Sequence, residues 1–244
     1  MNAAALIGAT LIGLILGLTG AGGSIITLPV LVYAAGVSPP EAVGLSLCIV
    51  GAASFAGALQ RWRAGEVHLR VALMFTLAGA VGAAVGAQLT PLVAPAVLMN
   101  LFALLMLVIG IKMLLQKNEA PVMAPECQPL RCLLAGGAVG VLTGFIGVGG
   151  GFLLVPALVK FARLPLRIAA GTSLAIIAFN SAAGALSHQT ITREHWPLVG
   201  TFSVLAILGV LAGNVIGHRL SAIRLRQAFA ALVLITAVWV LLHP

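Results

Sequence analysis

Long apolar stretches alternate with short polar segments along almost the whole chain. A helix needs about 20 residues to cross a hydrocarbon core of about 30 Å. Six apolar stretches have that length: 40–60, 69–89, 93–115, 167–187, 197–217 and 222–242. Two longer stretches, 3–36 and 131–163, are each interrupted by a glycine-rich segment. The pattern predicts an all-α, polytopic integral membrane protein.

The two glycine-rich interruptions have nearly the same sequence. Residues 17–29 read GLTGAGGSIITLP and residues 144–156 read GFIGVGGGFLLVP, so that their prolines lie 127 positions apart (156 − 29 = 127). The same offset continues without a gap and still pairs Phe102 with Phe229. Self-similarity over such a length predicts two tandem copies of one structural unit.

The positions of Lys and Arg indicate how each copy is oriented. In the first copy, residues 1–116, the basic residues gather in the loop 61–70; in the second, residues 131–244, they gather in the loops 160–167 and 219–226. Short basic loops tend to remain cytoplasmic. The loops that lie inside in one copy are therefore outside in the other, and the polar linker 117–130 is predicted to be cytoplasmic.

An inverted arrangement requires an odd number of crossings in each copy. We therefore predict that each glycine-broken stretch forms a helical hairpin that leaves the membrane on the side where it entered, and that three transmembrane helices follow it. Inverted-topology repeats of this kind occur in secondary transporters, whose substrate sites lie near the midplane where broken helices meet.

Composition and charge limit the classes of function. Of the residues, 61% are hydrophobic and 7% charged, and the net charge is +8. In a membrane protein a basic excess belongs to cytoplasmic loops, so no nucleic-acid partner is expected. The cysteines show no C-x-x-C spacing, which argues against a zinc site and against a disulfide. The chain has no aspartate, and its glutamates lie at predicted loops or helix ends, which disfavours coupling through a buried carboxylate.

The doubled motif G-x-x-G-x-G-G-G/S is followed in each copy by a proline and then by a G-[LT]-S-L helix, at 44–47 and 171–174. This combination resembles the TauE/SafE family over nearly the whole chain. At the last position of this motif the first copy has Ser24 where the second has Gly151. The resemblance implies a transporter of small sulfur-containing anions such as sulfite and organosulfonates, in the inner (plasma) membrane, with export as the expected direction.

The glycine tips of the two hairpins are the expected anion site. Glycines allow positive φ and a close approach to backbone amides, and the helix after each tip offers free N–H groups and the positive end of its dipole. Serine and asparagine side chains of the next helix add donors. The expected substrate-binding residues are Thr19, Gly20, Gly22, Gly23, Ser24, Ser46, Gly147, Gly149, Gly150, Gly151, Ser173 and Asn180.

Alternatives remain open at this point. The tip glycines could serve close helix packing alone, and Asn180 could bond a neighbouring helix. Arg61 and His188 occupy equivalent positions and could guide anions or anchor helix ends. An anion channel would use the same groups as a carrier. A membrane-embedded enzyme needs a nucleophile and base or metal ligands in mutual reach, which the sequence does not offer, so no catalytic residue, metal or cofactor is expected. The expected partners are the lipid bilayer and the anion; a homo-oligomer remains open.

Overall fold

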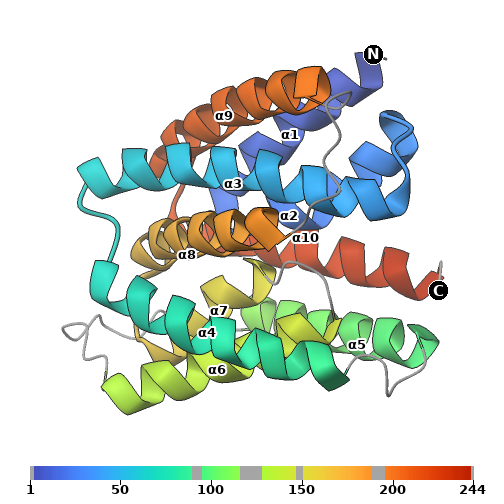
Figure 1. Cartoon of the computed structure of the whole chain (residues 1–244). Helices are drawn as coiled ribbons and strands as arrows, with labels where there is room; N and C mark the ends of the chain where they lie inside the picture. Colours follow the sequence, from blue (N-terminus) through green and yellow to red (C-terminus); the bar gives the residue numbers. More distant parts are fainter. Residues whose placement is uncertain (1–2, 90–94, 116–127, 147–150, 188–195, 243–244) are drawn as a thin grey trace.

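The computed structural model describes residues 3–89, 95–115, 128–146, 151–187 and 196–242, and these ranges are helical, with no strand among them (Figure 1). The elements are α1 (Ala3–Thr19), α2 (Gly23–Pro29), the π-helical η1 (Val30–Ala34), α3 (Pro39–Arg63), α4 (Leu69–Leu89), α5 (Pro95–Leu115), α6 (Pro129–Ile146), α7 (Gly151–Phe161), α8 (Leu166–Ser187), α9 (Trp196–Arg219) and α10 (Ala222–Leu242). The all-α prediction is confirmed. Within the described residues, parts of α3, α4, α8 and α9 are long and apolar enough to cross a membrane.

The first glycine-broken stretch forms the predicted hairpin. α1 ends at Thr19, and α2 begins at Gly23 after a tip in which Gly20 has a φ of +78°. A Cβ built on Gly23 would lie 2.7 Å from the carbonyl oxygen of Ile12, and one on Gly8 would lie 2.7 Å from Cγ1 of Val30. The segment after the tip therefore runs back along α1. In the second stretch α6 contacts α7, and the tip, residues 147–150, lies outside the described residues.

Glycines bring helices of the two predicted copies into backbone contact. A Cβ on Gly82 of α4 would lie 2.2 Å from the carbonyl oxygen of Gly137 in α6. A Cβ on Gly209 of α9 would lie 2.4 Å from the carbonyl oxygen of Thr10 in α1. The 127-residue offset converts the first contact into the second with the copies exchanged. Reciprocal contacts of this kind are what a two-fold axis between the copies produces.

The crossing of α3 and α8 shows the same reciprocity. A Cβ on Gly57 would lie 3.1 Å from Cδ1 of Leu174, and a Cβ on Gly184 would lie 3.1 Å from Cδ1 of Leu47. Gly57 of α3 faces Leu174 of α8, while the earlier Leu47 of α3 faces the later Gly184 of α8. The two helices therefore run in opposite directions. Such contacts support the inverted repeat, whose orientation in a membrane stays a prediction.

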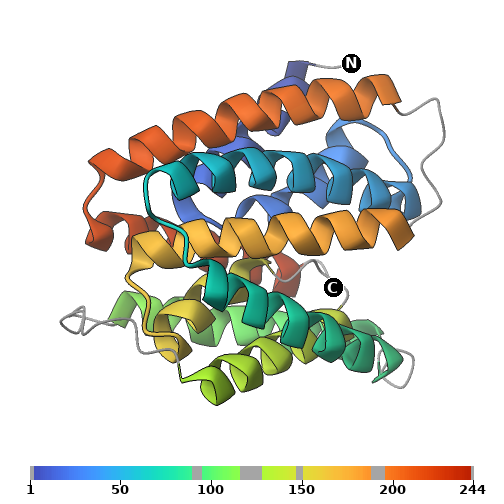
Figure 2. The same ribbon diagram turned by 60° about the vertical axis from the view of Figure 1, so that its left-hand side comes forward.

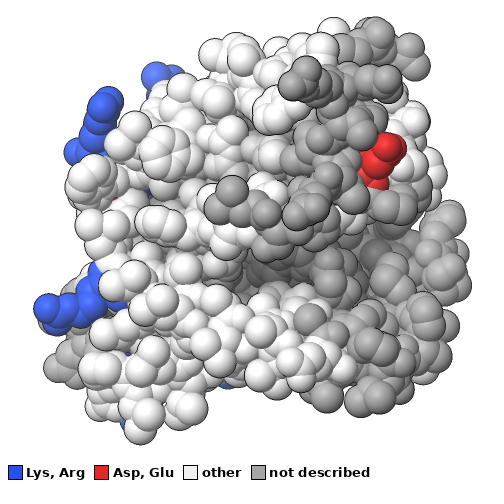
Figure 3. All heavy atoms as spheres, viewed as in Figure 1, with Lys and Arg blue, Asp and Glu red and all other residues white. Residues whose placement is uncertain are grey.

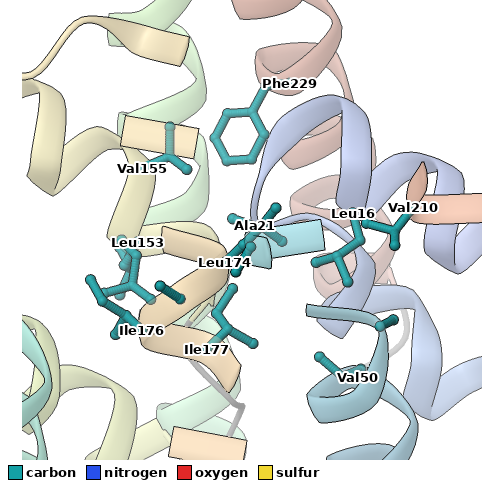
Figure 4. Packing of buried hydrophobic residues seen from close by; sticks show 14 of the residues in the cluster. Leu16, Ala21, Val50, Leu153, Val155, Leu174, Ile176, Ile177, Val210 and Phe229 are labelled. Carbon is teal, nitrogen blue, oxygen red and sulfur yellow. The ribbon is translucent and has the colours of Figure 1, made fainter. Parts of the chain in front are cut away.

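The most extensive helix pairings all join the two predicted copies: α4 with α6, α1 with α9, α3 with α8, α5 with α10 and α3 with α9. Figure 2 shows α9, α3, α8 and α4 following one another in a layer. Exchanging the copies gives the same order reversed. Buried apolar side chains fill the interior, and Figure 4 shows Ala21 of the first tip near the centre of the cluster, between residues of α8 and of α1.

Basic residues collect at one end of the molecule. The α3–α4, α7–α8 and α9–α10 connections lie at the left end of Figure 1. Arg63 and Arg219 are the last residues of α3 and α9, and Arg163 lies between α7 and α8. Figure 3 shows Lys and Arg atoms along the same edge, while the acidic atoms visible on this face lie near the opposite edge. The positive-inside rule predicts that the basic end faces the cytoplasm.

Cysteine labelling tests this orientation. In a cysteine-free background, we expect Arg63→Cys to resist a membrane-impermeant maleimide applied to intact cells, because Arg63 is exposed at the basic end. Ser38→Cys, exposed before the start of α3, should react readily under the same conditions. The opposite result for the two positions would reverse the topology.

One expectation about the cysteines is wrong. Cys132, near the start of α6, is disulfide-bonded, with its partner outside the described residues, whereas Cys48 is free. Disulfides persist in oxidising compartments. The positive-inside rule predicts instead that the start of α6 faces the reducing cytoplasm. The charge pattern rests on basic residues in three separate segments, 61–70, 160–167 and 219–226, and the labelling of Arg63→Cys and Ser38→Cys decides between the two indications.

Candidate anion site at the first glycine tip

The first tip satisfies several of its own backbone groups. The Thr19 hydroxyl donates to the carbonyl oxygen of Ile15 at 2.7 Å and accepts from the amide of Gly22 at 3.0 Å. The amide of Gly20 donates to the carbonyl oxygen of Leu16 at 2.8 Å. Thr19 is therefore the side chain that ends α1 and starts the turn toward α2.

The tip is held against the N-terminal half of α8. Ser173 Oγ lies 2.7 Å from the carbonyl oxygen of Gly20 and 2.8 Å from that of Ala170, so its single proton serves a backbone acceptor at either position. A Cβ on Gly20 would lie 2.6 Å from Cα of Ala170. Positive φ and this contact both require glycine at position 20. The structure thus brings together three expected site residues, Thr19, Gly20 and Ser173.

The other expected residues are more dispersed. Gly22 and Gly23 are buried at the start of α2, where a built Cβ would meet Cδ2 of Leu232 at 2.4 Å and Cβ of Leu16 at 2.7 Å, respectively. In this structure, therefore, Gly22 and Gly23 serve close packing, which was the alternative to anion binding. Three expected residues sit on helices apart from it: Ser46, whose hydroxyl donates to the carbonyl oxygen of Val43 at 2.8 Å; Asn180, exposed on α8; and Gly151, buried at the start of α7.

Some expected residues cannot be compared. Ser24 belongs to α2, but its side chain is not among those described. Gly147, Gly149 and Gly150 lie outside the described residues, as does His188. The shared anion site between the two tips stays a prediction.

A buried arginine near the tip organises a polar cluster that the sequence did not predict. Arg61, in the last turns of α3, is 2% exposed. Its Nε donates to Oδ1 of Asn214 at 2.8 Å, its Nη2 to the carbonyl oxygen of Gly17 at 2.8 Å, and its Nη1 to Oε2 of Glu66 at 3.1 Å. The cation thereby joins α1, α3, α9 and the α3–α4 connection.

The partners of Arg61 are themselves bonded. Asn214 Nδ2 donates to Oε1 of Gln60 at 2.8 Å and to the carbonyl oxygen of Gly57 at 3.3 Å. Glu66 Oε1 lies 3.5 Å from Nδ1 of His218. A buried polar network in which each member has a partner holds its elements in one arrangement.

The α3–α4 connection also fastens this cluster to α8. The amide of His68 donates to Oγ1 of Thr172 at 3.0 Å. A Cβ on Gly171 would lie 2.3 Å from the carbonyl oxygen of Glu66 and 3.2 Å from Cδ of Arg61. Since Gly171, Thr172 and Ser173 are consecutive, the arginine cluster and the first tip contact the same turn of α8 and form one polar region.

The sequence contained a signal for this cluster. Arg61 and Asn214 are polar residues in two predominantly apolar helices, and such residues usually pair with each other in membranes. They are 153 positions apart, so only the packing of α3 on α9 reveals the pair. The prediction that glutamates lie at loops or helix ends holds for Glu66, yet its side chain is only 15% exposed and paired.

Among the described residues, no group of three His, Cys, Asp or Glu side chains is placed to hold a metal ion. The polar region is instead built from the Arg61 guanidinium and the Glu66 carboxylate with His218 beside it, together with side-chain amides, hydroxyls and backbone carbonyls. Groups of this kind can bind an oxyanion through hydrogen bonds and charge.

Comparisons with known proteins support a transport role. The family model described as sulfite exporter TauE/SafE matches residues 5–240. A probable membrane transporter protein of Xylella fastidiosa is 35% identical over 238 residues, which cover 95% of this chain and 91% of that protein. The probable membrane transporter protein YdhB of Bacillus subtilis is 28% identical over 241 residues, covering 92% of this chain and 96% of that protein.

More distant similarity reaches plants. Sulfite exporter TauE/SafE family protein 2 of Arabidopsis thaliana is 32% identical over 85 residues, which cover 35% of this chain and 18% of that protein. No solved structure matches the chain. The family resemblance drawn from the doubled glycine motif is confirmed, and with it a multi-pass membrane protein of a transporter family. The chain belongs to the sulfite exporter TauE/SafE family.

Proposed function

We propose that this protein is a carrier that exports sulfite, an organosulfonate or a similar small sulfur-containing anion across the inner (plasma) membrane. The observation that carries the proposal is the match of the sulfite exporter model to residues 5–240, nearly the whole chain. The Xylella and Bacillus relatives, which are named as probable membrane transporters, agree with a transport role.

The proposed substrate site lies between the two glycine tips, near the membrane midplane, with Ser46, Ser173 and Asn180 as side-chain donors. Contact between α2 and α7 supports this placement, because these are the helices that begin at the two tips. The reciprocal helix contacts support the inverted repeat that would bring two oppositely directed hairpins to one site.

Electrical driving force suits export. An anion that leaves a cell with a negative interior gains about 2.3 kcal/mol per charge per 100 mV. The chain has no aspartate, and Glu66 is engaged by Arg61. Export driven by the membrane potential would need no coupling ion.

Counterflow in liposomes tests the function. Proteoliposomes loaded with unlabelled sulfite should accumulate radiolabelled sulfite against its gradient, and thiosulfate, sulfoacetate and taurine added outside should compete according to their affinity. A carrier gives this transient accumulation, whereas collapse of the gradient without accumulation would identify a channel. If the protein moves none of the four anions, the proposed substrate class is contradicted.

A further inference from the structure

We propose that Arg61 binds the transported oxyanion and that Glu66 is the counter-ion that occupies Arg61 when no substrate is present. This inference rests on the proposed function and assigns it a residue outside the glycine tips. It follows from the burial of Arg61, the way its donors are used, and its position beside the first tip.

The burial of this ion pair calls for a reason other than stability. Arg61 is 2% exposed and Glu66 15% exposed at the side chain. Removing two charges from water costs about as much as their attraction returns, and apolar residues of similar size often stabilise a protein as well or better. A buried arginine in a membrane helix is also costly and usually marks an ion or substrate path.

The hydrogen bonds of Arg61 fall into two groups. Nε and Nη2 bond uncharged groups of the protein, whereas Nη1 bonds a carboxylate that an anion can replace. Nε and Nη2 of Arg61 are held by Asn214 and by the carbonyl oxygen of Gly17, neither of which carries a charge. Nη1 faces the carboxylate of Glu66 at 3.1 Å and, more weakly, the carbonyl oxygen of Arg167 at 3.4 Å. An oxygen of sulfite or a sulfonate can accept the same charge-assisted bond as a carboxylate oxygen. The anion can therefore replace Glu66 while the guanidinium keeps its place.

When the anion displaces the Glu66 carboxylate from Arg61, the carboxylate can move to a solvated position. It belongs to the short connection between α3 and α4, its side chain already reaches solvent, and its second oxygen lies 3.5 Å from Nδ1 of His218, which is 40% exposed. The carboxylate can turn outward toward His218 and water without leaving a charge buried.

A surface depression reaches Gln60, which is linked to the buried Arg61 through Asn214. A depression of about 340 Å³ between α3 and α9 is lined by Gln60 and Arg63 together with Ala56, Leu59 and Leu211. Gln60 accepts from Asn214, which in turn accepts from Arg61. Arg61 in turn donates to the carbonyl oxygen of Gly17, three residues before Gly20 of the first tip. Gly20 is bonded to Ser173 of α8. An anion entering at the basic end would thus meet Arg61 before it reaches the first tip.

The competing explanation is that Arg61 only fastens the helices together. Glu66→Gln separates the two explanations because it keeps the size and polarity of the side chain but removes its charge. If Arg61 binds the substrate, losing the resident counter-ion should tighten anion binding about tenfold, the worth of roughly one charge-assisted hydrogen bond. If Arg61 is only structural, the variant loses stability and gains no affinity.

The experiment measures the Kd of sulfite, thiosulfate and sulfoacetate for the purified full chain in detergent, at constant ionic strength. We expect Glu66→Gln to bind about tenfold more tightly than the original chain, and Arg61→Gln to bind at least about tenfold more weakly. The matched control is Glu41→Gln, which makes the same chemical change where Glu41 accepts from Ser38 at the start of α3; its affinity should not change.

Folding is followed in parallel through the melting temperature. If Arg61→Gln does not fold, Arg61→Lys replaces it, since lysine keeps the charge but loses the planar set of donors and should still weaken binding. Unchanged or weaker binding by folded Glu66→Gln would overturn the inference while leaving the transport proposal intact. No binding of any of these anions by the original chain, together with no counterflow, would instead overturn the proposed function.

Discussion

Gly209→Val should strongly destabilise the folded protein, whereas Gly200→Val on the same helix should leave its stability close to the original. A Cβ at Gly209 would lie 2.4 Å from the carbonyl oxygen of Thr10 and 2.8 Å from the amide nitrogen of Leu14. Both are backbone atoms of α1, so α1 and α9 must separate to make room. Overpacking of this kind costs about 1–3 kcal/mol where side chains can yield, and more where only backbone can move.

Gly200 provides the matched control because nothing lies within 4 Å of a Cβ built there. Thermal unfolding of the purified variants in one detergent measures the difference, which we expect to be at least about 10 °C between the two positions, since 1 kcal/mol corresponds to roughly 2–4 °C for a chain of this size. Gly82→Val should resemble Gly209→Val, because a Cβ there would lie 2.2 Å from the carbonyl oxygen of Gly137. Equal melting temperatures for Gly209→Val and Gly200→Val would show that the α1–α9 contact is not as described.

The second large effect concerns transport itself. Gly22→Val and Gly149→Val should abolish anion transport while the protein remains folded. At Gly22 a new Cβ would lie 2.4 Å from Cδ2 of Leu232, 3.0 Å from Cγ2 of Ile15 and 3.1 Å from Oγ1 of Thr19. All three are side-chain atoms, which can shift without separating the helices. The valine methyl groups would then occupy the space before the first tip and keep an anion from its amides. Gly149 holds the corresponding place in the second copy.

Counterflow with sulfite measures this effect, and the melting temperature of each variant must be compared with that of Gly200→Val to exclude misfolding. Gly20→Ala is unsuitable for this test, because its φ of +78° and its contact with Ala170 predict loss of folding instead. If folded Gly22→Val and Gly149→Val proteins transport sulfite normally, the tips serve packing and the proposed site is wrong.

The helices could be predicted from the sequence because apolar length and the doubled motif are local signals. The stretches at 69–89 and 222–242 coincide with α4 and α10, and the hairpin of the first copy turns where its glycines lie. The π-helical turn that follows Pro29 was not foreseen; it arises where proline removes a backbone donor inside a helix.

The site was predicted less well, because its contacts depend on packing. Ser173 was expected to donate to the anion, but here its hydroxyl serves backbone carbonyls, including that of Gly20 in the first tip. Arg61 was expected to guide anions or to anchor a helix end, and Asn214 was not among the expected binding residues. A local sequence pattern cannot predict that Arg61 and Asn214, which are 153 positions apart, contact each other. The disulfide of Cys132 likewise has no signal in the spacing of the cysteines.

The pairing of helices across the two copies has a consequence for biosynthesis. α1, α4 and α5 are made and inserted before α9, α6 and α10, their principal partners, have left the ribosome. Until then the glycine faces that later meet backbone, such as those of Gly13 and Gly82, can contact only lipid or the insertion machinery. The first half therefore reaches its final packing after it has crossed the membrane, and the order of synthesis leaves the last helix to complete the assembly.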